Sequence, residues 1–292
     1  MSEISSSHIK KIGIVGAGQM GIGIAYVSAV VAKRNVVIMD TQQKQLDGGL
    51  KFIDGLLKKE VSKGRLSEAE IPDIKGRLQV TTTTDSFSDV DFVVEAATEN
   101  PELKAKIFEG LDKAVPAGVV LASNTSSISI TKIASSTNRP EKVIGMHFMN
   151  PVPVMKLVEI IPGIATSPDT LAVTRHLASD MGKTVTTSND YPGFIANRIL
   201  MPYINEAVYV LMEGVGTKED IDTTMKLGTN VPMGPLTLAD FIGLDTCLAI
   251  MRVLHSQLGD AKYRPCPLLI NYVNAGWLGK KTGRGFYEYP AK

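Results

Sequence analysis

This sequence of 292 residues has few cysteines and a net charge close to zero. Its two cysteines, Cys247 and Cys266, form no Cys-x-x-Cys pair and no metal-ligand spacing, so we expect no bound metal and interpret both as small packed side chains. Isolated thiols also suit a reducing compartment. A formal net charge of +1 gives no reason to expect nucleic acid or an acidic surface as a partner.

Long apolar runs are absent as well. No stretch reaches the roughly 18 apolar residues that span a bilayer. The first ten residues, MSEISSSHIK, lack the apolar core of a secretory signal and the arginines of a transit peptide. We therefore expect an intracellular protein without a membrane partner, cytoplasmic in the first place, with the mitochondrial matrix and the peroxisome as alternatives. The length predicts one large or two ordinary domains.

A glycine-rich turn follows the first strand-like run, Lys11 to Val15. Its spacing is Gly-x-Gly-x-x-Gly, formed by Gly16, Gly18 and Gly21. The three glycines suit a tight turn, close approach of the backbone to a pyrophosphate, and packing of a helix on a strand. The helix that follows begins at Gln19 and Met20, and its N-terminal N–H groups would point at the phosphates. The strand-to-helix setting favours a dinucleotide site, for which the motif alone would be weak evidence.

Asp40 ends the second expected strand, Val36 to Met39, nineteen residues after Gly21. A carboxylate at this place accepts the adenosine ribose hydroxyls of NAD and repels the 2′-phosphate of NADP. The alternative is that Asp40 caps the next helix. Motif, spacing and strand context together favour NAD, and no arginine closely follows Asp40 to hold the NADP phosphate.

The next segment, Gln42 to Arg65, combines helical spacing of its apolar residues with many lysines. A charge run of this kind is usually a solvated helix face. It could instead bind a phosphate-rich tail such as that of coenzyme A. Both interpretations stay open.

Polar loops follow three further expected strands, Leu78 to Thr82, Phe92 to Glu95 and Val119 to Ala122. In a parallel sheet, the loops at the carboxyl ends of the strands meet the cofactor. Glu99 and Lys104 follow the second of these strands, so both are candidate cofactor contacts. A surface ion pair is the alternative for them.

The loop after Ala122 has the sequence SNTSSISI. Ser129 can cap the next helix, which leaves Ser123, Asn124 and Ser126 as candidates for ligand binding. Capping is the alternative for these three residues, and position alone favours ligand binding only slightly.

Two ionisable residues lie on neighbouring apolar strands, Val143 to His147 and Met155 to Ile161, which a Pro-rich turn joins. An imidazole takes up and releases a proton near neutral pH, and a neighbouring carboxylate can orient it. A lone histidine is more often a core or surface residue. The carboxylate of Glu159 in KLVEII is harder to dismiss, because an unpaired buried charge is costly. Lys156 is an alternative partner, and His147 with Glu159 is the candidate general acid/base pair.

Strand–helix alternation over the first 189 residues predicts an α/β fold with a Rossmann-like, doubly wound and largely parallel sheet. From Tyr191 onward the periodicity becomes helical, so we expect an NAD-binding domain over 1–189 and an all-α domain over 190–292. Its expected helices are Phe194 to Glu213, Lys218 to Leu227 and Leu236 to Leu258. The third is apolar on most of its surface and must be buried, which predicts a homodimer through the helical domain.

A series of motifs, taken in order, resembles the L-3-hydroxyacyl-CoA dehydrogenases, including the short-chain 3-hydroxybutyryl-CoA dehydrogenases. The motifs are GAGQMGIGIA, VVEAATEN, ASNTSS, GMHFMNPVPVMKLVEII, DYPGFIANRI, EDIDTTMKLG, PMGPLTLADFIGLD and GKKTGRGFYEY. They extend from about residue 10 to residue 289. Their combination is far more specific than the glycine motif alone.

The resemblance implies NAD as cofactor and the reversible oxidation of the 3-hydroxyl of an acyl-CoA substrate, as in the beta-oxidation of fatty acid metabolism. It implies a helical domain that forms a homodimer. The implied catalytic residues are His147, Glu159, Ser126 and Asn197. The implied cofactor contacts are the glycine turn with Gln19 and Met20, and Asp40, Glu99, Lys104, Asn124 and Asn150.

These residues support a mechanism in which NAD accepts the hydride and His147 accepts the hydroxyl proton. Glu159 would orient the imidazole, and Ser126 and Asn197 would hydrogen-bond the reacting oxygen or His147. The nearest alternative is a related NAD-dependent dehydrogenase of a free hydroxy acid or sugar acid. A non-catalytic NAD(H)-binding protein is a second, and one half of a multifunctional fatty-acid oxidation enzyme conflicts with the lack of an additional domain in 292 residues.

Overall fold

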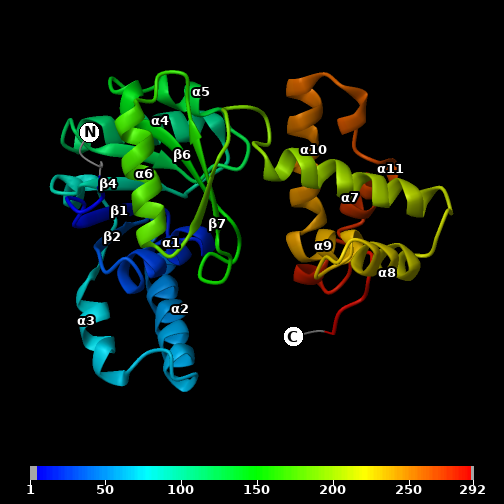
Figure 1. Ribbon diagram of the computed structural model, residues 1–292, viewed down its shortest axis with the longest axis horizontal. Coiled ribbons are helices and arrows are strands. Elements are labelled where there is room, and N and C mark those ends of the chain that lie inside the picture. Colours follow the sequence, from blue (N-terminus) through cyan, green and yellow to red (C-terminus); the bar gives the residue numbers. More distant parts are fainter. Residues whose placement is uncertain (1–4, 291–292) are drawn as a thin grey trace. The chain divides into compact units, whose positions relative to one another are not determined.

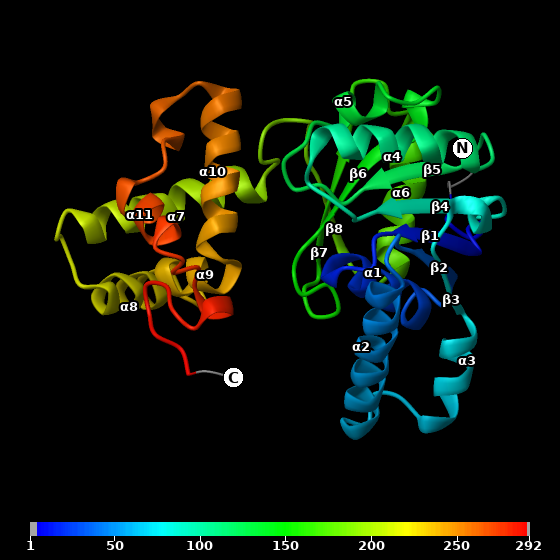
Figure 2. The same cartoon turned by 180° about the vertical axis from the view of Figure 1, so that it is seen from behind.

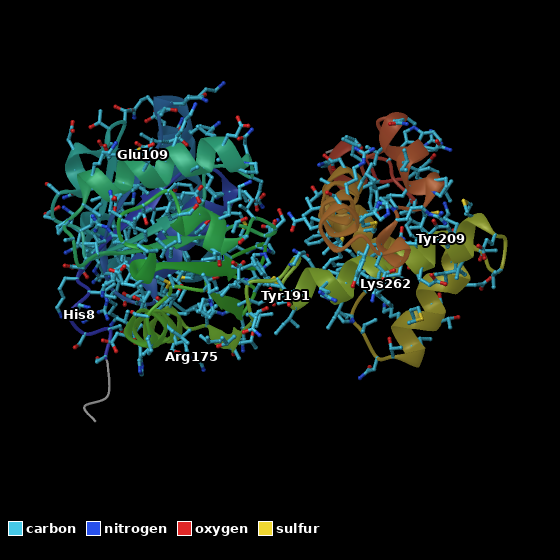
Figure 3. The ribbon with its side chains drawn as sticks, turned by 90° about the horizontal axis from the view of Figure 1, so that it is seen from above. His8, Glu109, Arg175, Tyr191, Tyr209 and Lys262 are labelled. Carbon is cyan, nitrogen blue, oxygen red and sulfur yellow. The ribbon has the colours of Figure 1, made fainter. Side chains whose placement is uncertain are left out.

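The computed structural model describes residues 5–290, and the chain separates into two compact units (Figure 1). The first unit is Met1–Tyr191 and the second is Pro192–Lys292, two residues later than the expected division. Tyr191, labelled in Figure 3, is 60% exposed at the end of the first unit. Each unit has a buried apolar core of its own.

One eight-stranded sheet forms the centre of the first unit, with the strand order β3-β2-β1-β4-β5-β6-β7-β8. All neighbouring strands are parallel except β6 and β7, which are antiparallel. The predicted α/β fold with a doubly wound, largely parallel sheet is therefore confirmed. The strands are β1 (Lys11–Val15), β2 (Asn35–Met39), β3 (Leu78–Thr81), β4 (Phe92–Glu95), β5 (Val120–Ser123), β6 (Val143–Phe148), β7 (Leu157–Pro162) and β8 (Thr184–Thr187).

Helices cover both faces of this sheet, and Figures 1 and 2 show α4 and α6 on opposite faces. Every residue of β4 and β6 is buried, as expected for strands of a sheet that is covered on both sides. The helices of this unit are α1 (Gln19–Val30), α2 (Gln43–Ser62), α3 (Ile71–Gly76), α4 (Pro101–Ala114), α5 (Ile130–Ala134) and α6 (Pro168–Asp180). Short 3-10 turns lie at Glu68–Glu70, Thr84–Phe87 and Pro140–Lys142.

Side-chain caps fix the starts of the two helices that follow β4 and β5. Oδ1 of Asn100 accepts the N–H of Leu103 at 2.9 Å where α4 begins. The hydroxyl of Ser129 accepts the N–H of Lys132 at 3.2 Å where α5 begins. The predicted capping by Ser129 is confirmed, and the two caps define where the loops at the carboxyl edge of the sheet end.

The second unit is built from helices packed on a common apolar core. The single helix expected over residues 236–258 is wrong, because Gly243 adopts a positive φ of 104° and divides it into two. Its apolar residues Leu236, Leu244 and Leu248 are buried in the core of their own unit. The helices are α7 (Ala196–Met212), α8 (Lys218–Gly228), α9 (Pro235–Ile242), α10 (Leu244–Leu258) and α11 (Pro267–Asn274), with 3-10 turns at Ala261–Tyr263 and Lys280–Thr282. Within residues 5–290, no helix is long and apolar enough to cross a membrane.

A buried carboxylate holds the last described segment of the second unit. Asp240 accepts the N–H groups of Phe286 and Tyr287 and the hydroxyl of Tyr289, each at 2.9 Å. Burial raises the pKa of Asp240 above its usual value, although these three donors oppose that shift. The segment from Phe286 to Tyr289 is therefore fixed to α9 by hydrogen bonds to one side chain.

Candidate active site

His147 and Glu159 are direct register partners across the antiparallel strands β6 and β7. Nδ1 of His147 lies 2.9 Å from Oε2 of Glu159, and the two residues are 7% and 1% exposed. Because a carboxylate only accepts hydrogen bonds, we assign the proton of this bond to Nδ1, so that Nε2 is the ring nitrogen able to accept a proton. The structure brings the predicted pair together, whereas Lys156, the alternative partner, is exposed. A catalytic role for the pair stays a prediction.

The turn between β6 and β7 is fixed from two sides. Nζ of Lys183 donates to the carbonyl oxygens of Val152 and Met155 at 2.5 and 2.9 Å. Burial lowers the pKa of the Lys183 amine. On the side of α1, a Cβ on Gly23 would lie 2.8 Å from Cβ of Val152, so the helix and the turn pack closely. Met155 belongs to this turn, which is why β7 begins at Leu157 and not, as expected, at Met155.

The glycine turn has the geometry that a dinucleotide requires. Gly16 has a φ of 100°, and a Cβ there would lie 2.7 Å from Cα of Ala97. A Cβ on Gly21 would lie 1.9 Å from the carbonyl oxygen of Gly16, so only glycine permits this helix–strand contact. A Cβ on Gly18 would meet nothing within 4 Å, and Gly18 heads α1 without a side-chain cap. Space at the helix start and N–H groups in its first turn fit the pyrophosphate of NAD.

Asp40 lies beside this turn, at the end of β2. Its Oδ2 accepts the N–H of Ala17 at 2.9 Å, and its Oδ1 accepts the N–H of Gln42 at 2.9 Å. The N-cap residue of α2 is Gln42 and not Asp40. The alternative in which Asp40 caps this helix is therefore not what the structure shows. Asp40 is attached to the glycine turn itself, and its contact with the ribose stays a prediction.

A buried polar cluster lies at the carboxyl ends of β4 and β5. Lys104 is 1% exposed, and its amine donates to Oε2 of Glu95 and, at 3.2 Å, to the hydroxyl of Ser123. The surface ion pair considered for Lys104 and Glu99 is wrong, because the partner of Lys104 is Glu95. A contact of Lys104 with the cofactor stays a prediction. Glu95 was not predicted as a site residue, although a charge at the end of the apolar strand FVVE was a signal that a buried partner was needed.

Two further contacts attach the loop after β5 to its neighbours. Oδ1 of Asn124 accepts the N–H of Phe148 at 2.9 Å, directly beside His147 in the chain. The carboxylate of Glu99 accepts the hydroxyl and the N–H of Ser126 at 2.8 and 2.6 Å, and the hydroxyl of Thr125 at 2.8 Å. Asn124, Glu99 and Ser126 thus belong to one connected loop region at the carboxyl edge of the sheet.

Other predicted residues lie in the turn after β6, in the second unit and on α2. Asn150 is exposed in the turn that follows β6. Asn197 is 8% exposed in the first turn of α7, in the second unit, and its approach to the reacting groups stays a prediction. The lysines of α2 are exposed, as expected of a solvated helix face, and a contact with coenzyme A there also stays a prediction.

A groove of about 390 Å³ lies between α6 and β8. Arg175, labelled in Figure 3, contributes to it from α6, and Val185 contributes from β8. Its lining includes none of the predicted site residues, so we leave it outside the candidate active site. In the part of the chain that the structure describes, no group of three or more His, Cys, Asp or Glu residues could hold a metal ion.

Comparison with known proteins assigns both units. Residues 11–191 match the NAD binding domain of 3-hydroxyacyl-CoA dehydrogenase, and residues 193–289 match its C-terminal domain. NAD is therefore the cofactor. A probable 3-hydroxybutyryl-CoA dehydrogenase of Bacillus subtilis is 55% identical over 97% of this chain and 99% of its own.

Two further relatives give the same assignment. The 3-hydroxybutyryl-CoA dehydrogenase of Bradyrhizobium diazoefficiens is 53% identical over 96% of each chain. The crystal structure of (S)-3-hydroxybutyryl-CoA dehydrogenase from Ralstonia eutropha has a TM-score of 0.94 and 49% identity, over 97% of this chain and 100% of its own. The chain thus belongs to the 3-hydroxyacyl-CoA dehydrogenase family.

Proposed function

We propose that the protein catalyses the reversible, NAD-dependent oxidation of an L-3-hydroxyacyl-CoA to the 3-ketoacyl-CoA. The observation that carries this proposal is the buried hydrogen bond between His147 and Glu159, in the same unit as a glycine turn with dinucleotide geometry. The relatives named 3-hydroxybutyryl-CoA dehydrogenase support a short acyl chain.

Each residue of the candidate active site has a separate role in the proposed reaction. NAD, when bound, supplies the acceptor for the hydride that leaves C3. His147 takes the hydroxyl proton on Nε2 and returns it in the reverse direction. Glu159 keeps the ring in one orientation and stabilises the imidazolium that forms. Ser126 and Asn197 hydrogen-bond the reacting oxygen or His147, so that the proton transfer is in line.

Initial rates of NADH oxidation test the substrate class. We expect turnover with acetoacetyl-CoA and little with acetoacetate, because the proposal requires the thioester. Equal or better rates with free 3-keto acids would favour a dehydrogenase of free hydroxy acids. NADPH should support much lower rates than NADH, because the carboxylate of Asp40 repels a 2′-phosphate.

The substitution His147→Asn tests the general base. It should lower kcat by roughly 10² to 10⁴, the usual contribution of such a group, while NADH still binds in a fluorescence titration. Near-wild-type turnover of this variant would remove His147 from the mechanism. Wild-type protein that binds NADH but reduces no 3-ketoacyl compound would instead support a non-catalytic role.

We also propose a homodimer formed by the helices of the second unit, in a cytoplasmic protein. Large apolar side chains on these helices support the dimer: Ile199 and Leu227 are 67% and 74% exposed. Sedimentation at micromolar concentration should give a dimer, and Ile199→Asp or Leu227→Asp should weaken it. A wild-type protein that sediments only as a monomer would contradict the proposal.

A further inference from the structure

The carboxylate of Glu99 connects the loop after β4 to the loop after β5. Its Oε1 accepts both the N–H of Ser126, at 2.6 Å, and the hydroxyl of Ser126, at 2.8 Å. Its Oε2 accepts the hydroxyl of Thr125 at 2.8 Å. Both oxygens of one side chain are thus directed at two consecutive residues of the neighbouring loop.

Further hydrogen bonds fix the shape and position of the loop after β5. The hydroxyl oxygen of Thr125 accepts the N–H of Ile128 at 2.9 Å, so the residue that Glu99 holds also organises the turn leading to α5. On the other side, Asn124 is attached to Phe148 and β6. Ser126 therefore lies between two fixed points, and Glu99 contacts both the backbone N–H and the hydroxyl of Ser126.

The hydroxyl of Ser126 has one hydrogen, and Glu99 accepts it. A carboxylate cannot donate in return, so this contact sets the rotation of the hydroxyl as well as its location. Charge-assisted bonds of this type are roughly twice as strong as neutral ones. An error of about 1 Å in a positioning group is sufficient to lower a rate by roughly 10²-fold.

We infer that Glu99 is a positioning residue for the reaction, and that it acts through Ser126. This inference rests on the proposed function, in which Ser126 hydrogen-bonds the reacting oxygen or His147. Because Glu99 accepts the one hydrogen of the hydroxyl, the oxygen of Ser126 takes part there as the acceptor. In this role Glu99 affects kcat at saturating NADH. A contact with the cofactor alone would affect only the affinity for NADH. The effect of losing Glu99 should then depend on whether Ser126 is present.

A double-mutant cycle measures this dependence. Glu99→Ala should lower kcat at saturating NADH by about 10- to 100-fold, and Ser126→Ala should also lower it. In the double variant, the loss of Glu99 should add less than about twofold. Glu99→Gln should recover most of the turnover, because its amide oxygen can still accept both hydrogen bonds from Ser126. Glu102→Ala, an exposed carboxylate in the first turn of α4, is the matched control.

Two results would overturn the inference. One is a loss from Glu99→Ala that is equally large with and without Ser126. The other is a loss of NADH affinity alone, seen in a fluorescence titration, with kcat at saturation unchanged. Failure of the proposed function has a separate signature, since the wild-type protein itself would then not turn over acetoacetyl-CoA. Should Glu99→Ala not fold, Glu99→Asp in both backgrounds gives the same comparison, because its shortened side chain withdraws the acceptor from Ser126.

Discussion

Two carboxylates of the first unit are almost completely removed from solvent, and each has a different kind of partner. Glu95, at 0% exposure, forms an ion pair with the amine of Lys104. Glu159, at 1% exposure, pairs with the imidazole of His147, which is charged only when protonated. The first pair is therefore suited to hold structure, and the second is suited to a charge that appears during a reaction.

Glu159→Gln should lower kcat by about 10² or more, because an amide stabilises an imidazolium less well than a carboxylate and can reverse the orientation of the ring. Steady-state rates from pH 6 to 10 would measure both the loss and the change in the pH–rate profile. Glu141→Gln, an exposed site in the same unit, is the control. A profile identical to that of the wild type would contradict the predicted dyad.

Glu95→Gln should destabilise the first unit by about 3 to 5 kcal/mol, because it leaves the buried amine of Lys104 without a negative partner. Urea unfolding compares the variant with the wild type. The double variant Glu95→Leu, Lys104→Met should recover much of the loss, since it removes both charges. If the single substitution cost less than about 1 kcal/mol, the pair would be no more important than a surface ion pair.

Among the elements, the hairpin β6–turn–β7 is the one that positions the candidate chemistry. Its register places His147 opposite Glu159, and its turn is held by Lys183 from the residue just before β8. This arrangement could be predicted only in part. Apolar strands around a single histidine and a single glutamate indicated the pair, but no local pattern indicated that a lysine some thirty residues away would hold the turn.

Lys183→Met should retain the packing of the aliphatic stem and remove two hydrogen bonds to the turn. We expect the free energy of unfolding to fall by about 1 to 3 kcal/mol. Turnover should fall by about tenfold, because the dyad loses support at one end. Lys156→Met, an exposed lysine next to the same turn, should change neither quantity measurably. Equal effects of the two substitutions would show that the hydrogen bonds of Lys183 to the turn have no special role.

Local patterns predicted the strands of the sheet to within about two residues, because apolar β-branched runs and the glycine turn are read directly from the sequence. They failed at Gly243, where helical periodicity on both sides concealed a positive φ. They also failed to predict α11 (Pro267–Asn274), which no analysed pattern indicated. Contacts such as Glu99 with Ser126 depend on strands placed side by side by the whole sheet, and no local signal encodes them.

At the scale of the whole molecule, the acids whose pKa values burial raises most lie in the second unit. Burial raises the pKa of Cys247 to about 12, and it also raises the pKa values of Tyr287 and Tyr289, all in the second unit. In the first unit, burial raises the pKa of Tyr26 and lowers the pKa of Lys183. An acid whose folded pKa is raised loses stability as pH rises above its unfolded pKa, whereas a base with a lowered pKa gains it.

The second unit should therefore unfold before the first as pH rises from 9 to 12. Each neutral group that ionises only in the unfolded state costs about 1.4 kcal/mol per pH unit. Trp277, the one tryptophan of the sequence, lies in the second unit, so its fluorescence reports on that unit during urea unfolding. Circular dichroism follows the whole chain. In the Cys247→Ala variant, the urea midpoint of the tryptophan transition should depend less steeply on pH. A wild-type midpoint that moves to higher urea as the pH rises would contradict the prediction.

The strand order also bears on how the protein avoids aggregation. The sheet is open, and β3 and β8 each leave one side of their backbone without a neighbouring strand in the described part of the chain. Unpaired edges invite the addition of strands from other molecules. Both edges are only four residues long, and the sequence of β8, TVTT, exposes threonine side chains rather than an apolar surface. Edges this short offer few unpaired backbone groups to a strand of another molecule, which limits edge-to-edge pairing of the open sheet.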